Sequence, residues 1–305
     1  MKLVFLGTGA ALPSKERAPS ALALFYNGEI LLFDCGEGAQ RQLMHSDLSF
    51  MKVERIFVSH FHGDHFLGIC GLIQSFSLNK RERPLHIFGP VETVKFTQMM
   101  MTLGYFGLGF DVVAHELEVG DVEDFGEYSV TAVQANHTTP AALGYLFREK
   151  PRPGRFKKKR ALELGVPEGK LFSWLQRGEE VTLEDGTVVK PEQVLGPSRP
   201  GRSMLYTGDT TPCEGLAEAA KGVDVLVHEA TFGSELETQG NEFGHSSASQ
   251  AATLAKEAKV GKLFLTHISP RYKDNEEKLL VEARAVFPES ELAKDFLEYD
   301  VKLKK

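Results

Sequence analysis

Residues 59–65 read Ser-His-Phe-His-Gly-Asp-His and follow an apolar run that ends at Val58. Three imidazoles and a carboxylate within six positions rarely serve packing, and a buried strand over residues 56–58 would carry them to its end. Neutral imidazole and carboxylate are ligands of zinc and similar cations, and Gly63 lets the loop turn tightly. The pattern predicts a metal-binding loop; the alternative is a polar loop that happens to be rich in histidine.

Three further residues of ligand type also follow strand-like runs, namely His137, Asp209 and His267. An isolated histidine is more often a satisfied polar residue than a ligand. Three of them at three strand ends, together with the loop, instead indicate one shared site. The combined set exceeds the four ligands of one tetrahedral ion. It therefore favours a two-metal site made of His60, His62, Asp64, His65, His137, Asp209 and His267.

Composition is that of an ordinary soluble globular chain, with 305 residues of which 42% are hydrophobic and 25% charged. No stretch is long enough for a transmembrane helix, so no membrane partner is expected. Gly7-Thr8-Gly9 interrupts the N-terminal apolar run before it reaches signal-peptide length, and Leu12 breaks the dinucleotide-binding fingerprint. Three cysteines without a C-x-x-C pair predict reduced thiols and a cytoplasmic location.

Charge is distributed unevenly along the chain. The net charge is −7, yet residues 148–162 hold eight basic residues against one acidic residue, a local +7. This asymmetry predicts an anion-binding element, with a solvated basic loop as the alternative. The basic residues are Arg148, Lys150, Arg152, Arg155, Lys157, Lys158, Lys159 and Arg160.

Strand and helix patterns recur in two similar halves on either side of residues 148–202. Strands are predicted at 3–6, 21–26, 30–34, 55–59, 128–133, 144–147, 204–207, 223–228 and 262–266, and helices at 36–44, from 68 onward, and at 91–102, 216–221, 247–258 and 276–286. This grouping favours a sheet-on-sheet core flanked by helices. Six prolines break the pattern between 148 and 202, which predicts an inserted segment within a single domain spanning 1–305. The apolar stretch of Met99–Met101 with Tyr105, Phe106, Leu108 and Phe110 predicts core packing or a subunit interface.

The chain resembles the metallo-β-lactamase fold superfamily and, more specifically, the ribonuclease Z family, whose members are endonucleases that trim the 3′ trailer from precursor tRNA. The motifs that carry this resemblance are Phe5-Leu6-Gly7-Thr8-Gly9, Asp34-Cys35-Gly36-Glu37-Gly38-Ala39-Gln40, residues 59–65, residues 203–210 around Asp209, His228-Glu229-Ala230-Thr231, His245-Ser246-Ser247, Thr266-His267-Ile268-Ser269 and Ala293-Lys294-Asp295-Phe296. The resemblance implies an α/β fold, a four-layer αββα sandwich with its metals at one edge and a protruding basic arm at 148–202. Two differences from the family pattern are Ala18, where bacterial members often have asparagine, and Lys170, where the arm usually has proline.

By this resemblance His60, His62 and His137 hold the first of two zinc ions, and Asp64, His65 and His267 hold the second, with Asp209 bridging both. Manganese or iron would also suit these ligands. Asp64 is expected to accept the proton of the attacking water. His245 is the candidate acid for the leaving oxygen and Glu229 its partner; the alternatives are a helix-capping surface histidine and an ordinary salt bridge.

The expected partners are precursor tRNA and a second copy of the chain in a homodimer, as implied by the resemblance. The arm would contact backbone phosphates without reading sequence, through Arg152, Arg155, Lys157, Lys158, Lys159 and Arg160. Two other functions remain open: a dinuclear metal hydrolase of a small phosphodiester or ester, and a non-catalytic RNA-binding protein. The second is disfavoured because every metal ligand is present.

Overall fold

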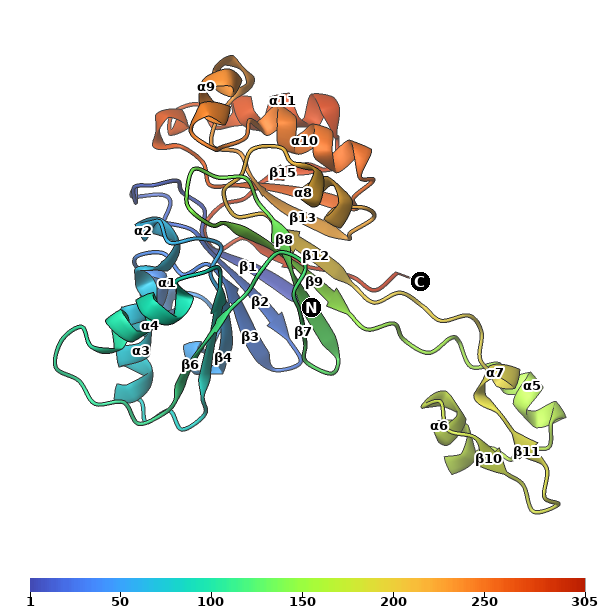
Figure 1. Cartoon of the computed structure of the whole chain (residues 1–305). Helices are drawn as coiled ribbons and strands as arrows, with labels where there is room; N and C mark the ends of the chain where they lie inside the picture. Colours follow the sequence, from blue (N-terminus) through green and yellow to red (C-terminus); the bar gives the residue numbers. More distant parts are fainter. Residues whose placement is uncertain (305) are drawn as a thin grey trace. The chain divides into compact units, whose positions relative to one another are not determined.

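The computed structural model describes residues 1–304, which divide into two compact units (Figure 1). The first unit comprises residues 1–147 and 203–302, and the second comprises residues 148–202 with the C-terminal residues from Leu303. No helix in residues 1–304 has the length and apolar character required to span a bilayer.

The N-terminal half of the first unit forms one seven-stranded sheet, which the last strand of the chain completes. Its strand order is β16-β1-β2-β3-β4-β5-β6. The strands are β1 (Lys2–Gly7), β2 (Ala21–Tyr26), β3 (Glu29–Phe33), β4 (Val53–Phe57), β5 (Leu85–Gly89), β6 (Val112–Glu116) and β16 (Glu298–Asp300). Strands β3 to β6 run parallel, so their carboxyl ends lie along the same edge.

A second seven-stranded sheet has the order β15-β14-β13-β12-β9-β8-β7. Its strands are β7 (Val122–Asp124), β8 (Tyr128–Gln134), β9 (Leu143–Glu149), β12 (Ser203–Tyr206), β13 (Val225–Glu229), β14 (Lys262–Thr266) and β15 (Ser290–Leu292). Strands β12 to β15 are parallel to one another. The carboxyl ends of these four strands lie along one edge of the sheet. In both sheets, the residues that follow the parallel strands are therefore close together.

Aromatic side chains fill the space between the two sheets. Phe5 of β1 packs against Phe264 of β14 with ring centroids 5.1 Å apart, and Phe33 of β3 packs against Tyr206 of β12 at 5.9 Å. Both sheets bury their inner faces in this core, which supplies most of the apolar contact between the halves. The two sheets therefore form the central pair of layers.

Helices cover the outer face of each sheet (Figure 1). The first sheet is covered by α1 (Ala39–His45), α3 (Gly68–Leu78) and α4 (Thr93–Met101), and the short α2 (Gly63–Phe66) precedes α3. The second sheet is covered by α8 (Glu214–Ala219), α10 (Ala248–Glu257) and α11 (Glu277–Val286), with α9 (Glu237–Glu242) before α10. The result is a four-layer αββα sandwich, which confirms the predicted fold class.

The second unit contains three short helices and one two-stranded antiparallel sheet. They are α5 (Lys158–Glu163), α6 (Lys170–Gln176), α7 (Pro191–Val194), β10 (Val181–Thr182) and β11 (Val188–Val189). A small core of its own holds the unit together, made of Ala161, Val166, Leu175, Val181, Val189 and Val194. The β10–β11 hairpin is too short to leave a periodic pattern in the sequence.

Candidate metal centre and active site

The predicted ligands all lie just beyond strand ends. The loop with His60 follows β4, His137 follows β8, Asp209 follows β12 and His267 follows β14 directly. Because these strands end at the edges described above, residues up to about two hundred positions apart meet in space. Three groups whose potential ligand atoms lie within 4.8 Å of one another contain all seven predicted ligands. They are His60 with His62 and His137, His60 with His65 and Asp209, and Asp64 with His65 and His267.

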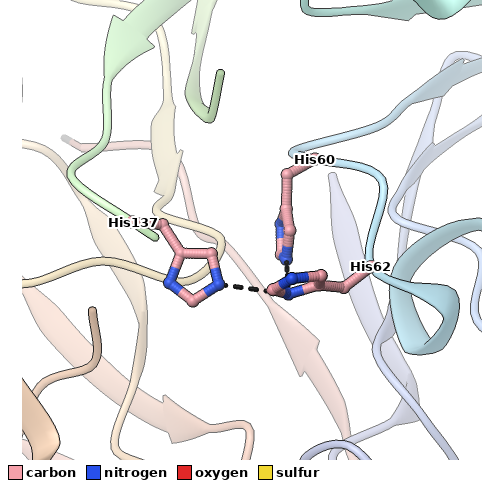
Figure 2. Close-up of side chains that lie close together, drawn as sticks. All are labelled: His60, His62 and His137. Atoms are coloured by element: carbon pink, nitrogen blue, oxygen red, sulfur yellow. Dashed lines mark hydrogen bonds between the residues drawn. The ribbon is translucent and has the colours of Figure 1, made fainter. Parts of the chain in front are cut away.

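In the first group, three imidazoles point toward one another (Figure 2). His62 Nδ1 lies 3.1 Å from His60 Nε2 and 3.2 Å from His137 Nε2. His60 and His137 lie on different loops, and each directs its Nε2 atom at His62. Three converging nitrogens of this kind form the side of a cation site rather than a packing contact.

The second group places two carboxylates against the remaining imidazoles. Asp64 Oδ2 lies 3.4 Å from His65 Nε2 and 3.3 Å from His267 Nε2. Asp209 Oδ2 is 3.2 Å from His65 Nε2, 3.4 Å from His267 Nε2 and 3.8 Å from His60 Nε2. Asp209 is thus the residue within reach of both halves of the cluster, the position expected of a bridging ligand.

Two buried polar atoms in this cluster, His65 Nε2 and Asp209 Oδ1, have no hydrogen-bond partner. Buried polar atoms are almost always satisfied, and leaving one unpaired is costly. A cation between these side chains would satisfy both atoms at once. The nitrogen and oxygen donor set therefore fits a metal centre.

In four of the five histidines, the ring nitrogen that faces away from the cluster makes a hydrogen bond. Each of these Nδ1 atoms lies within 3.0 Å of an oxygen, an arrangement that fixes the tautomer and leaves the Nε2 lone pair directed into the cluster. The pairs are His60 with Ser59 Oγ, His65 with Asp34 Oδ2, His137 with the Gly244 carbonyl, and His267 with Thr231 Oγ1.

Asp34 opens one of the motifs that carry the family resemblance, but no role was predicted for it. It is fully buried after β3, and its carboxylate accepts hydrogen bonds from the Ser59 backbone and hydroxyl, from the Tyr206 hydroxyl at 2.7 Å and from His65 Nδ1 at 2.7 Å. Asp34 has φ 58° and His267 has φ 55°, both in the left-handed region. Residues held there cost roughly 1–3 kcal/mol each and are retained where the surroundings demand them. Asp34 could have been noticed in the sequence because it directly follows the strand-like run that forms β3.

Glu229 and His245 form a hydrogen-bonded pair next to the cluster. Glu229 ends β13, is buried, and its Oε1 lies 2.9 Å from His245 Nδ1. Its carboxylate also accepts the Thr210 N–H and both the N–H and hydroxyl of Thr231. Burial opposes the charged imidazole, but the negative charge and hydrogen bond of Glu229 outweigh it and raise the pKa of His245 to about 9. The pairing with Glu229 therefore favours the protonated imidazole of His245.

The alternative reading of His245 as a helix cap does not match the structure. Ser247 is the N-cap of α10, and its hydroxyl accepts the Gln250 N–H. His228 is buried, and its Nδ1 donates to the Glu229 carbonyl at 2.7 Å.

The N-terminal loop also contacts the cluster. The Ala11 N–H donates to Asp64 Oδ2 at 2.8 Å, and the preceding residues pair with Ile268 beside His267. Arg17 anchors this loop through two hydrogen bonds to Glu276, at 2.6 and 2.8 Å, and is buried. Arg17 is thus turned inward, and its role in this chain is to hold the loop that orients Asp64.

The predicted substrate-binding residues belong to the second unit. Arg152 is half-buried and hydrogen-bonds the Arg199 backbone, while Arg155 and the run from Lys157 to Arg160 are exposed. Lys158 pairs with Glu168 and Arg160 with Glu163 on the surface. Exposed pairs of this kind contribute little to stability and leave the cations available to an anionic ligand.

Comparisons with known proteins place this fold and site in a class. The family model described as "Beta-lactamase superfamily domain" matches residues 186–268, and the model described as "Anti-Pycsar protein Apyc1" matches residues 1–99. The structure is also similar to the metallo-β-lactamase fold protein YhfI from Bacillus subtilis, with TM-score 0.70 and 19% identity over 98% of each chain. The chain is a metallo-β-lactamase fold protein.

Closer relatives narrow the class to a family. Ribonuclease Z of Methanosarcina acetivorans is 48% identical over 99% of this chain and 98% of its own length, and ribonuclease Z of Myxococcus xanthus is 46% identical over 93% and 92%. The short form of human tRNase Z has TM-score 0.73 and 30% identity, covering 99% of this chain and all of its own. The chain belongs to the ribonuclease Z family of endoribonucleases.

Proposed function

We propose that this chain removes the 3′ trailer from precursor tRNA by hydrolysing one phosphodiester bond and leaves a 3′-hydroxyl on the tRNA. The observation that carries the proposal is the Glu229–His245 pair beside a seven-ligand metal centre, in a chain 48% identical to a ribonuclease Z. Hydrolysis of RNA at this bond expels a ribose oxygen, which needs a proton to leave. The pair supplies an acid at the place where the centre would bind the phosphate.

The metal ligands divide into two sets that share Asp209. His60, His62 and His137 would hold one ion, and Asp64, His65 and His267 the other; zinc suits this donor set, and manganese or iron would also fit. Two such cations supply positive charge to the scissile phosphate and lower the pKa of the attacking water.

The chain's own residues then move the protons. Asp64 accepts a proton from the attacking water while the Ala11 N–H holds one of its oxygens in place. His245 donates a proton from its outer ring nitrogen to the departing ribose 3′ oxygen. Glu229 keeps that imidazole charged and fixes its orientation through the 2.9 Å hydrogen bond.

Binding of the folded tRNA is assigned to residues 148–202. Their exposed Arg155, Lys157, Lys158, Lys159 and Arg160 would contact backbone phosphates in a salt-sensitive manner. Deleting residues 152–170 should weaken tRNA binding while leaving hydrolysis of a small phosphodiester nearly intact. Equal loss of both activities would contradict this division of labour.

The chain is proposed to act as a homodimer in the cytoplasm. Met100 and Phe110 are buried in the core, but Met99 near the end of α4 and Leu103 and Tyr105 after it expose most of their apolar surface. Apolar side chains gathered on one exposed segment suit a subunit interface. All three cysteines, at positions 35, 70 and 213, are free thiols, as a reducing compartment would keep them.

Incubation of the metal-loaded protein with a precursor tRNA, followed by mapping of both product ends, tests the proposal. We expect one cut at the end of the tRNA body, a 3′-hydroxyl on the tRNA, and no cut by the His65→Ala variant. No cut by the unmodified protein, with bis(p-nitrophenyl) phosphate still hydrolysed, would favour a dinuclear hydrolase of a small phosphodiester or ester.

A further inference from the structure

We propose that a cavity beside His62 holds the base of the first trailer nucleotide by stacking, without reading its identity. This inference rests on the proposed function. The cavity has a volume of about 280 Å³ and is lined by Phe61, His62, Val91, Glu92, Phe96 and residues 138–141. His62 belongs both to this wall and to the metal cluster, so the cavity opens directly beside the expected position of the scissile phosphate.

The cavity wall contains two aromatic rings held in place by a third ring. Phe61 and Phe96 lie with ring centroids 4.5 Å apart and 34° between their planes. Phe66 packs against both, at 5.3 Å from Phe61 and 5.6 Å from Phe96. Both lining rings are half-buried, so each keeps part of its surface toward solvent while its position is set by packing. Rings fixed in this way can stack on a base with little loss of side-chain freedom.

Four of the nine lining residues have polar side chains, namely His62, Glu92, Thr138 and Thr139, and two of these are already engaged. The Thr139 hydroxyl donates to the Ala141 carbonyl at 3.1 Å, and Glu92 pairs with Lys95 on the surface. Val91 and Pro140 add exposed apolar surface. Reading one base against another needs donors and acceptors directed at its edge. The rings of Phe61 and Phe96 can instead stack on any base, because every base has a π-face.

The position of the catalytic pair decides which nucleotide enters. His245 protonates the oxygen that stays with the tRNA, so the tRNA side of the scissile bond lies at His245. Neither His245 nor Glu229 contributes to the cavity wall, which shares only His62 with the centre. The nucleotide beyond the phosphate on this side is the first of the trailer.

The cavity volume of about 280 Å³ leaves room for one base. Sites for drug-sized ligands occupy about 300–1,000 Å³, and this cavity is slightly smaller. A stacked base beside the scissile phosphate would also restrict how that phosphate is oriented at the centre. Tolerance of sequence combined with fixed geometry is what an enzyme needs when the trailer varies between substrates.

Precursor tRNAs lacking one base test the proposal in the unmodified full-length protein. Removing the base of the first trailer nucleotide should raise KM about tenfold, the lower part of the range for one aromatic–base stack. Removing the base four positions further along the trailer should leave KM unchanged. Equal KM values for the intact substrate and for the substrate abasic at the first trailer position would overturn the proposal. So would a rise confined to the substrate that is abasic at the last tRNA nucleotide.

A variant then locates the contact. With Phe96→Ala, the intact precursor should show the raised KM, and removing the first trailer base should add nothing further. Phe50→Ala removes a half-buried ring that stacks on Phe76 and lies outside the cavity wall, so this variant should keep full sensitivity to the missing base. Additive losses in Phe96→Ala would overturn the assignment to this ring. If the intact precursor is not cut at all, the proposed function fails and the subsite fails with it.

Discussion

Replacing His245 by alanine should slow cleavage of precursor tRNA far more than hydrolysis of bis(p-nitrophenyl) phosphate. A ribose 3′ oxygen is a poor leaving group without a proton, whereas p-nitrophenolate leaves readily as an anion. His245 is positioned for proton donation, because its Nδ1 is held by Glu229 at 2.9 Å and its other ring nitrogen remains for the substrate. A positioned general acid contributes about 10²–10⁴-fold, so kcat on tRNA should fall by that factor, or about 3–5 kcal/mol of barrier.

The Glu229→Gln variant should give a smaller loss of the same kind. Glu229 accepts hydrogen bonds from four donors, and an amide would turn an NH₂ group toward some of them. We expect a loss in kcat of about 10–100-fold, the usual effect of altering a partner that orients an active group. Combining both changes should cost no more than His245→Ala alone, because the two residues act as a unit.

Steady-state kinetics on both substrates, with metal content measured for every variant, checks this reasoning. His45→Ala serves as a matched control, because His45 is a histidine outside the ligand groups. If His245→Ala lost the same factor on both substrates, or lost bound metal, His245 would be supporting the centre instead of protonating the leaving oxygen.

Three further changes test other parts of the structure. Asp209→Asn should lower metal affinity, because Asp209 reaches both ligand sets. The loss should exceed the roughly 10–100-fold that follows removal of a residue hydrogen-bonded to a ligand. Unchanged metal stoichiometry by metal analysis would exclude a bridging role. Tyr105→Glu should convert the proposed dimer to a monomer in size-exclusion chromatography with light scattering, and an unchanged mass would place the interface elsewhere. His86→Gln should flatten the acid side of the stability profile: burial, followed by the charge of His115 at 3.0 Å, lowers the pKa of His86. The unfolded chain therefore binds more protons as pH falls below about 6.5, and stability is lost there; a Tm profile between about pH 7.5 and 5.5 that is the same in both proteins would contradict this.

The clustering of the candidate metal ligands was predictable because they follow strand signals. His60, Asp209 and His267 come directly after apolar runs, and parallel strands bring their carboxyl ends to a common edge. Asp34 also follows a strand, yet nothing in the chain links it to His65, 31 positions later. Thr231 likewise joins Glu229 to His267 only in the folded chain. Partners that orient a ligand depend on side-chain geometry, which periodicity does not contain.

Sequence patterns also missed several strands of the two sheets. Strand β5 is five residues long, and β6 has half-buried and exposed residues without clean alternation. Strands β7, β15 and β16 have three residues each. The three-residue strands are too short for a period-two pattern, and β5 and β6 do not alternate cleanly, so the pairing of all five comes from neighbouring strands. The layer architecture was nevertheless predictable, because the long inner strands and amphipathic helices determine which faces must be buried.

The metal cluster and the Glu229–His245 pair answer different chemical needs. The loop at residues 59–65 and the later ligands bind cations whatever ester is cleaved, so they cannot separate a nuclease from a hydrolase of small substrates. An acid held protonated by a buried carboxylate is useful only where the leaving oxygen is a poor one, as the ribose oxygen of RNA is. Glu229 lies at the end of β13, and its buried carboxylate accepts hydrogen bonds from Thr210 and Thr231 as well as facing His245. Because burying a charge is costly unless it is paired, this arrangement supports the proposal that the site acts on RNA and not on an activated ester.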